Sequence, residues 1–360
     1  VAAVAASLAN HLLALPVAFL ACFFAWPVAN IVAEGLSADG RWGLGGLGEV
    51  LEDGRLRRVA IFTPIQAAAS TLLTLAIGLP VAHVLARYAV PGRRAISALV
   101  MVPFVLPTVV VGAAFVALLG ERSPIGVDLR GSVWAILAAH AFFNVAVVIR
   151  TVGGLWEQID PRTEEAARAL GASPWRAWWE VTMPLLRPAI ATASLVVFLF
   201  SFTSFGVVLL LGGPRHSTLE VEIYRQTADL FDLPVASVLA LLQLAAVTVL
   251  LAVQDRLERR LPAAVAMSPP ERRPLRGRAG WGVAAVLVAL AAFLLTPLAV
   301  LVERSLRVGD GYGLAAWRAL AEEHERSGLF VPALDAVGTS LRFAVAATLI
   351  AVVLGGLAAA

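Results

Sequence analysis

Long apolar runs separated by short charged segments dominate the pattern of hydrophobic and polar positions along the chain. A run of about 20 apolar residues spans a bilayer as a helix, because each residue rises about 1.5 Å and the hydrocarbon core is about 30 Å thick. Backbone amides in lipid must bond within their own segment, so helices rather than strands are expected. Eight such runs cover residues 11–33, 59–86, 95–119, 132–150, 187–211, 234–253, 281–302 and 336–360. The pattern predicts an all-α fold, a polytopic transmembrane helical bundle with about eight spans.

The composition supports a membrane protein and excludes one route of ATP hydrolysis. The chain is 59% hydrophobic and 15% charged, whereas a soluble domain carries about a quarter charged residues. The net charge of +3 forms no basic stripe, so we expect the lipid bilayer and not nucleic acid as a partner. All 28 basic residues are arginine. A P-loop ATPase needs a lysine on the phosphates, so this chain cannot hydrolyse ATP by that route. No cofactor is predicted.

The arginines also predict the orientation in the membrane. Short cytoplasmic loops are enriched in positive charge. If the N-terminus is cytoplasmic, the inner segments are 87–94, 150–187 and 254–280. The first of these holds three arginines and no acid, and the last holds seven arginines. Both segments favour a multi-pass protein of the bacterial inner membrane with its N-terminus in the cytoplasm.

Two pairs of apolar runs align in order along the chain. Pro27 in the first run and Pro297 in the seventh coincide at an offset of 270 residues, and Gly78 in the second run faces Gly355 in the eighth. Chance alignment of alanine-rich helices is the alternative. The pairs predict a six-helix module followed by the start of a second copy, a parallel repeat of a kind known in transporters.

This repeat gives a predicted domain layout. A first spanning helix with a periplasmic loop covers 1–58, and a transmembrane domain covers 59–254. A cytoplasmic linker covers 255–280, and a truncated second module covers 281–360. The chain begins with valine and ends within an apolar run, which predicts a piece of a longer protein.

The segment 160–188 has the local signals of two short helices with a corner between them. Asp160 followed by Pro161 is typical of a helix start, with proline in the first turn and acids just after it. Gly171 is typical of a helix end. Ser173 and Pro174 then begin a second helix.

The second of these helices has two further features. Pro184 and Pro188 predict its end before the next span. Trp175, Trp178 and Trp179 lie at helical spacing along it. One interpretation is an interfacial helix with tryptophans at headgroup depth. That interpretation accounts for the tryptophans better than for the glycine corner and the prolines.

The same segment resembles the EAA loop of type-I ABC importer permeases. That pattern is Glu-Ala-Ala, three residues, Gly, nine residues, an aliphatic residue, one residue, Leu and Pro. The matching residues are Glu165, Ala166, Ala167, Gly171, Val181, Met183 and Pro184, with valine and methionine in place of the usual isoleucine and leucine. The resemblance implies that the loop docks into cytoplasmic ABC ATPase subunits, which bind ATP, with Glu165 facing their surface. It also implies a periplasmic solute-binding protein that delivers the substrate. A second EAA loop is not contained in this sequence.

A narrower resemblance concerns the substrate. Residues 138–144, 204–224 and 239–244 look like the permeases of thiamine transporters, which have two fused six-helix halves. Ferric-iron permeases share this architecture and a similar Gly-Gly-Pro then Ile-Tyr region. The resemblance therefore implies thiamine or its phosphates as substrate, with ferric iron or another small solute as the alternative.

Two groups of residues within the spans are candidates for the translocation path. His140 and Asn144 are four residues apart and so share one helix face. Buried polar groups at this depth face a cavity or another helix, and we favour a hydrogen bond between helices. Phe198, Phe202 and Phe205 form a stripe over which cationic thiamine could sit, although packing is the preferred interpretation.

Two other classes of membrane protein have their own signatures. An ion-coupled secondary transporter should carry a charged residue deep in a helix, and none is clearly central. A membrane-embedded enzyme should carry clustered metal ligands in its spans. The five histidines are widely scattered, so no metal site is predicted.

Overall fold

The computed structural model describes residues 14–38, 41–42, 48, 50, 52–121, 123, 126–258, 272–309, 311–321 and 333–359. Contacts divide the chain into two compact units, one formed by Val1–Arg41 with Val302–Ala360 and the other by Trp42–Leu301. The only strands in the described part form two two-stranded sheets. Residues 259–271, half of the predicted linker, lie outside the described residues.

Among the described residues, seven helices are long and apolar enough to cross a membrane, or eight if a bent helix pair counts as one span. The seven are Ala14–Gly35, Gly54–Arg87, Val133–Gln158, Pro174–Phe202, Leu233–Leu257, Ala279–Leu306 and Leu334–Ala358. Their number and length confirm the predicted all-α polytopic bundle. The domain layout and the internal repeat stay predictions.

The third apolar run is not the straight span that its length predicts. It consists of α5 (Arg93–Val105) and α6 (Thr108–Leu119), which are bent by 99° relative to one another. The bend lies at Leu106, whose ψ of 141° is extended. Pro107 follows it, and the ring of a proline disfavours the helical region for the preceding residue. A single proline therefore turns a run of spanning length into a broken element.

The fifth run also differs from the prediction of one span over 187–211. The helix α10 (Met183–Phe202) ends at Phe202, and the short α11 (Gly206–Leu211) follows as a separate element. A Cβ on Gly206 would lie 2.8 Å from Val109 N on α6. Close packing of α11 on α6 therefore requires glycine at this position.

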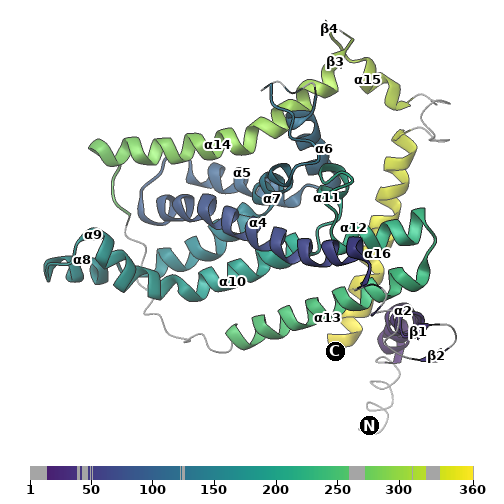
Figure 1. Cartoon of the computed structure of the whole chain (residues 1–360). Coiled ribbons are helices and arrows are strands. Elements are labelled where there is room, and N and C mark those ends of the chain that lie inside the picture. Colours follow the sequence, from purple (N-terminus) through teal and green to yellow (C-terminus); the bar gives the residue numbers. More distant parts are fainter. Residues whose placement is uncertain are drawn as a thin grey trace, which may run out of the picture. The chain divides into compact units, whose positions relative to one another are not determined.

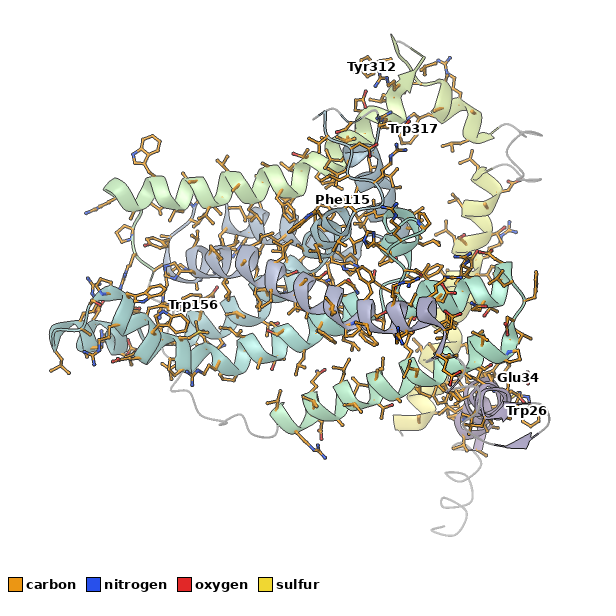
Figure 2. The ribbon with its side chains drawn as sticks, in the orientation of Figure 1. Trp26, Glu34, Phe115, Trp156, Tyr312 and Trp317 are labelled. Atoms are coloured by element: carbon orange, nitrogen blue, oxygen red, sulfur yellow. The ribbon has the colours of Figure 1, made fainter. Side chains whose placement is uncertain are left out.

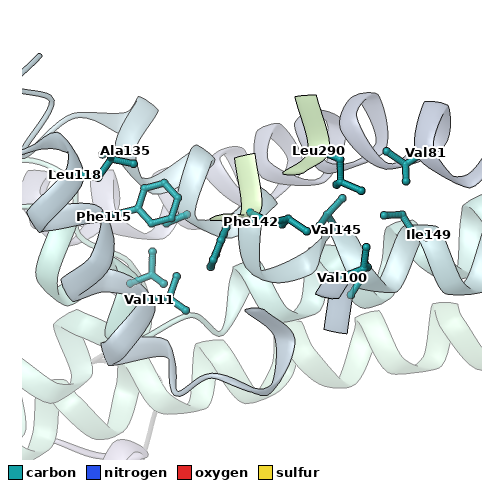
Figure 3. Packing of buried hydrophobic residues seen from close by; sticks show 14 of the residues in the cluster. Val81, Val100, Val111, Phe115, Leu118, Ala135, Phe142, Val145, Ile149 and Leu290 are labelled. Carbon is teal, nitrogen blue, oxygen red and sulfur yellow. The ribbon is translucent and has the colours of Figure 1, made fainter. Parts of the chain in front are cut away.

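The centre of the unit Trp42–Leu301 is the packing of α4 (Gly54–Arg87), α7 (Val133–Gln158) and α10 (Figure 1). A Cβ on Gly78 of α4 would lie 2.7 Å from Val148 Cγ1 of α7, so glycine permits close approach of the two helices, as in other membrane bundles. The apolar core continues to α14 (Gly277–Leu306), where Phe142 contacts Phe293 with ring centroids 6.0 Å apart. Figure 3 shows Phe142 between Phe115 and Val145 in this core.

Three consecutive elements of this unit are α12 (Leu219–Tyr224), η3 (Arg225–Asp229) and α13 (Leu233–Glu258). The π-helical turn η3 continues directly from α12. Buried Leu239 of α13 belongs to an apolar cluster with Leu56 of α4 and Phe202 of α10. Residues of α12 and α13 thus pack against the start of α4.

The other unit contains η1 (Ala21–Ala25), α2 (Trp26–Gly35) and α16 (Ala333–Ala359). It also contains the antiparallel pair β3 (Arg307–Val308) and β4 (Gly311–Tyr312), then α15 (Ala315–Arg318) and η4 (Ala319–Ala321). The strands β1 (Ser37–Ala38) and β2 (Arg41–Trp42) lie at its edge. Large apolar side chains such as Trp26 and Trp317 are exposed (Figure 2), which suits contact with lipid.

Candidate functional site

The segment between α7 and α10 folds as two helices with a glycine corner. The carboxylate of Asp160 accepts a hydrogen bond from Arg162 N at 2.9 Å at the start of α8 (Pro161–Ala169). Gly171 has a φ of +94°, a conformation that glycine adopts without the steric penalty of a Cβ. Ser173 Oγ accepts a hydrogen bond from Arg176 N at 3.2 Å and caps α9 (Pro174–Ala177). The predicted helix–corner–helix is therefore confirmed.

The prediction that Pro184 and Pro188 end the second helix is wrong. The chain stays helical from Pro174 to Phe202. A π-helical turn, η2 (Trp178–Thr182), lies directly before Pro184, which occupies the first turn of α10. A proline lacks an N–H and crowds the carbonyl four residues earlier. We infer that the wider π turn accommodates the proline without breaking the helix.

This segment presents an unusually open surface. No residue of α8 is buried, and Leu170 is 90% exposed. Trp175 is 69% exposed and stacks on Trp178 with centroids 5.6 Å apart, while Trp178 meets Trp179 edge to face. Apolar side chains therefore lie on the outside of a loop that holds charged residues.

The EAA-like residues occupy both sides of the corner. Glu165 and Ala166 are exposed and Ala167 is half-buried on α8, with Gly171 exposed at the corner. The other three, Val181, Met183 and Pro184, are half-buried at the junction of η2 and α10. Glu164 Oε2 accepts a hydrogen bond from Thr182 Oγ1 at 3.3 Å and so ties α8 to that junction.

Glu165 makes a contact that the sequence pattern does not indicate. Its Oε1 accepts a hydrogen bond from an Arg273 NH2 group at 3.3 Å. Arg273 lies 108 residues further along the chain, just before α14. The side chains are 56% and 44% exposed, so both remain accessible from solvent.

Backbone and charge contacts hold this part of the chain against the loop after α4. Arg273 N donates to Arg87 O at 2.8 Å, and Ala89 N donates to Arg273 O at 3.0 Å. Glu157, near the end of α7, pairs with both Arg93 and Arg272. Only the clustering of arginines in 87–94 and 254–280 pointed to a role for these residues.

Arg87 links the end of α4 to the start of the EAA-like segment. Its NH1 donates to Ile159 O at 2.8 Å, and its side chain is buried. The neighbouring Trp156 (Figure 2) is also buried and contacts the ring of His83 at 4.9 Å. The start of the segment 160–188 is therefore held by buried contacts with the end of α4.

His140 and Asn144 face neighbouring helices inside the bundle. His140 Nδ1 lies 3.0 Å from Ser70 Oγ of α4, and Asn144 Nδ2 donates to Ser201 Oγ of α10 at 3.4 Å. Gln66 of α4 also reaches Ser201, donating to its carbonyl at 2.8 Å. The polar groups join three helices, which is the interhelix bonding favoured from the sequence.

The phenylalanine stripe is only partly present. Phe198 and Phe202 stack on α10 with centroids 5.9 Å apart. Phe205 lies beyond the end of that helix and contacts Tyr224 at 5.1 Å. The prediction of one stripe on one helix is wrong, because the helix ends before Ser204. In the described residues there is also no group of three or more metal-ligating side chains.

Comparison with known proteins identifies the family to which the sequence is similar. The sequence profile of "Binding-protein-dependent transport system inner membrane component" matches residues 74–262. The molybdenum transport system permease protein ModB of Mycobacterium tuberculosis is 35% identical over 194 residues, covering 51% of this chain and 74% of that protein. The sulfate transport system permease protein CysT of Escherichia coli is 33% identical over 213 residues, covering 55% and 76%.

A third relative aligns over a longer stretch. The thiamine transport system permease protein ThiP of Escherichia coli is 30% identical over 319 residues, 85% of this chain and 56% of that protein. This chain thus spans about half of the thiamine permease. A crystal structure of a bacterial alginate ABC transporter in complex with an alginate-bound periplasmic protein matches with a TM-score of 0.57 at 17% identity, covering 70% of this chain and 94% of that chain. At this identity the likeness shows the fold.

The profile matches more than half of the chain, and two relatives above 30% identity are covered over more than two thirds of their length. The chain belongs to the family of inner-membrane components of binding-protein-dependent transport systems, the permeases of type-I ABC importers.

Proposed function

We propose that this permease imports thiamine or its phosphates. The observation that carries the proposal is the extent of the match, since the thiamine permease aligns with 85% of the chain and the molybdenum and sulfate permeases with 51% and 55%. The longer alignment reaches beyond residue 262, where the family profile ends. This supports a two-module arrangement in which 1–58 and 59–254 precede the linker 255–280 and a second module begins at 281.

The segment 160–188 is proposed as the contact with cytoplasmic ABC ATPase subunits. Its exposed helix α8, the exposed Leu170 and the glycine corner support this role. ATP binding and hydrolysis on those subunits would move α7 and α10 through the loop. The permease would thereby expose its path alternately to the two sides without covalent chemistry of its own.

The orientation follows from the same proposal. If the segment 160–188 is cytoplasmic, the start of α4 lies on the periplasmic side and the N-terminus lies in the cytoplasm. A periplasmic solute-binding protein would deliver substrate at the end where α4 begins. The arginines of 87–94 and 272–276 then lie inside, as the charge rule requires.

An inorganic oxyanion is the second candidate substrate. The molybdenum permease has the higher identity, 35%, although over a shorter stretch. Ferric iron, the alternative suggested by the sequence around 212–214, has no support from the relatives described above.

Growth tests separate these substrates. A strain that cannot synthesise thiamine should need the intact full-length gene for growth at low external thiamine or thiamine diphosphate. Unchanged growth on thiamine after deletion, together with loss of molybdate or sulfate uptake, would assign the oxyanion instead.

A further inference from the structure

A cavity of about 930 Å³ opens at the end of the bundle opposite the EAA-like segment. Its walls come from the start of α4, the loop 213–217, α12 and η3. Arg55 belongs to this wall, whereas Arg87 at the other end of α4 contacts Ile159 beside the segment. The 32 residues between them place the two sites about 48 Å apart along the helix axis.

The cavity lining is rich in arginine. Arg55, Arg58, Arg215 and Arg225 line it, against a single carboxylate, Asp229. Four guanidinium groups around one hollow repel each other unless an anion is present.

Arg55 alone among these arginines has a carboxylate partner within the described chain. Its NH2 donates to both carboxylate oxygens of Glu222, at 2.5 and 2.6 Å, and Glu222 is fully buried. The other three form no ion pair with described residues, and all three are exposed. Even with Asp229 counted, an excess of positive charge faces the hollow.

The walls of the cavity are held in place by contacts outside it. His216 Nδ1 lies 2.8 Å from Gly131 O, which fixes the loop that carries Arg215. Leu219 N donates to Thr63 Oγ1 at 3.0 Å, which joins α12 to α4. The arginines thus project from a preorganised frame.

Aromatic rings complete the lining. Phe62 and Tyr224 both face the cavity, and Tyr224 is held edge to face by Phe205. A cavity of this volume suits a ligand larger than a single tetrahedral oxyanion.

We propose that this cavity is an outer binding site for the anionic group of the transported substrate, such as a phosphate ester or another oxyanion. Guanidinium groups bind such groups through paired hydrogen bonds. The inference rests on the proposed import function and narrows it, because an anionic form of the substrate is selected over a cation. Phosphate esters of a ring compound would also contact Phe62 and Tyr224.

The test measures binding to the full-length permease assembled with its ATPase subunits in lipid nanodiscs. Calorimetry with thiamine diphosphate, inorganic pyrophosphate, molybdate, sulfate and free thiamine should show saturable binding of at least one of the anions and none of free thiamine. Arg58→Ala and Arg215→Ala should each weaken anion binding about tenfold, the loss expected for one hydrogen bond to a charged group. Arg57→Ala is the matched control, since Arg57 is exposed on the same turn but does not line the cavity.

A variant that should strengthen anion binding controls for loss of binding through misfolding. Asp229→Asn removes the only lining carboxylate and should tighten anion binding. Thiamine diphosphate binding much more tightly than pyrophosphate, with the difference lost in Phe62→Ala, would identify an organic ester. Equal affinities would identify the bare oxyanion.

Several results would overturn the inference. These are no saturable anion binding, equal effects of the Arg57 and Arg58 variants, or arginine variants that lose only capture of the periplasmic binding protein. The last result would assign the arginines to an acidic protein surface. Measurement of ATP-dependent uptake distinguishes failure of the anion site from failure of the proposed import function. Normal uptake in Arg58→Ala refutes only the anion site, whereas no uptake of any solute by the unchanged protein refutes the import function.

Discussion

Reversal of the charge at Glu165 separates two roles that this residue could have. Glu165 is proposed to face the ATPase, yet its carboxylate also pairs with Arg273 at 3.3 Å. Both side chains are about half exposed. Exposed pairs of this kind contribute at most about 1 kcal/mol, so loss of the pair alone should change any local equilibrium by about fivefold or less.

A charge at the contact with a partner has a larger effect. Like charges brought together across an interface cost several kcal/mol, which corresponds to a loss in affinity of a hundredfold or more. Glu165→Lys should therefore reduce co-purification of the ATPase and ATP-dependent uptake in proteoliposomes far beyond fivefold. Thermal stability should change little, because the residue is exposed.

Asp255→Lys is the matched control. Asp255 is also an exposed acid, near the end of α13 on the side proposed to be cytoplasmic, but it lies outside the segment 160–188. Its reversal should leave uptake within a few-fold of the unchanged protein.

The double variant Glu165→Lys with Arg273→Glu decides between the roles. The swap restores an ion pair within the chain but leaves the wrong charge toward the ATPase, so uptake should stay low. Recovery of uptake in the double variant would refute the reasoning and assign Glu165 to the contact with Arg273. Full activity of Glu165→Lys alone would favour the interfacial-helix interpretation, because a cation suits an anionic membrane surface.

Three further predictions follow from the geometry. Gly171→Val should lower uptake and ATPase association, since φ is +94° there and a β-branched residue costs about 1–2 kcal/mol in left-handed conformations; normal coupling would show that the corner angle is unimportant. Gly78→Leu should lower the melting temperature of the purified permease by overpacking against Val148, at a cost of about 1–3 kcal/mol, whereas an unchanged melting temperature would contradict the close approach of α4 and α7. Single cysteines at Ser173 and Ser217, with Cys22→Ala, should react with impermeant reagents from the cytoplasmic and periplasmic sides respectively, and labelling of both from the periplasm would reverse the orientation.

Features set by neighbouring residues could be predicted from the sequence. The start of α8 at Asp160-Pro161, the corner at Gly171 and the start of α9 at Ser173 all depend on capping and on glycine within a few residues. The spans likewise follow from the length of apolar runs. These signals gave the fold class and the position of the EAA-like segment.

Features that depend on distant residues could not be predicted. Arg273 reaches Glu165 across 108 residues, and Glu222 pairs with Arg55 across 167; no periodicity records either contact. The bend at Leu106 and the continuation through Pro184 show a further reason. A proline breaks the helix after Leu106 but is accommodated at Pro80 and Pro184, and composition alone does not distinguish the two outcomes.

Uptake into proteoliposomes tests the central claim most directly. The full-length permease is reconstituted with its ATPase subunits, periplasmic binding protein and labelled thiamine or thiamine diphosphate. We predict uptake that requires ATP on the ATPase side, requires the binding protein, and persists when ionophores collapse every ion gradient. Uptake without ATP that stops on addition of ionophore would contradict the account and identify an ion-coupled secondary transporter.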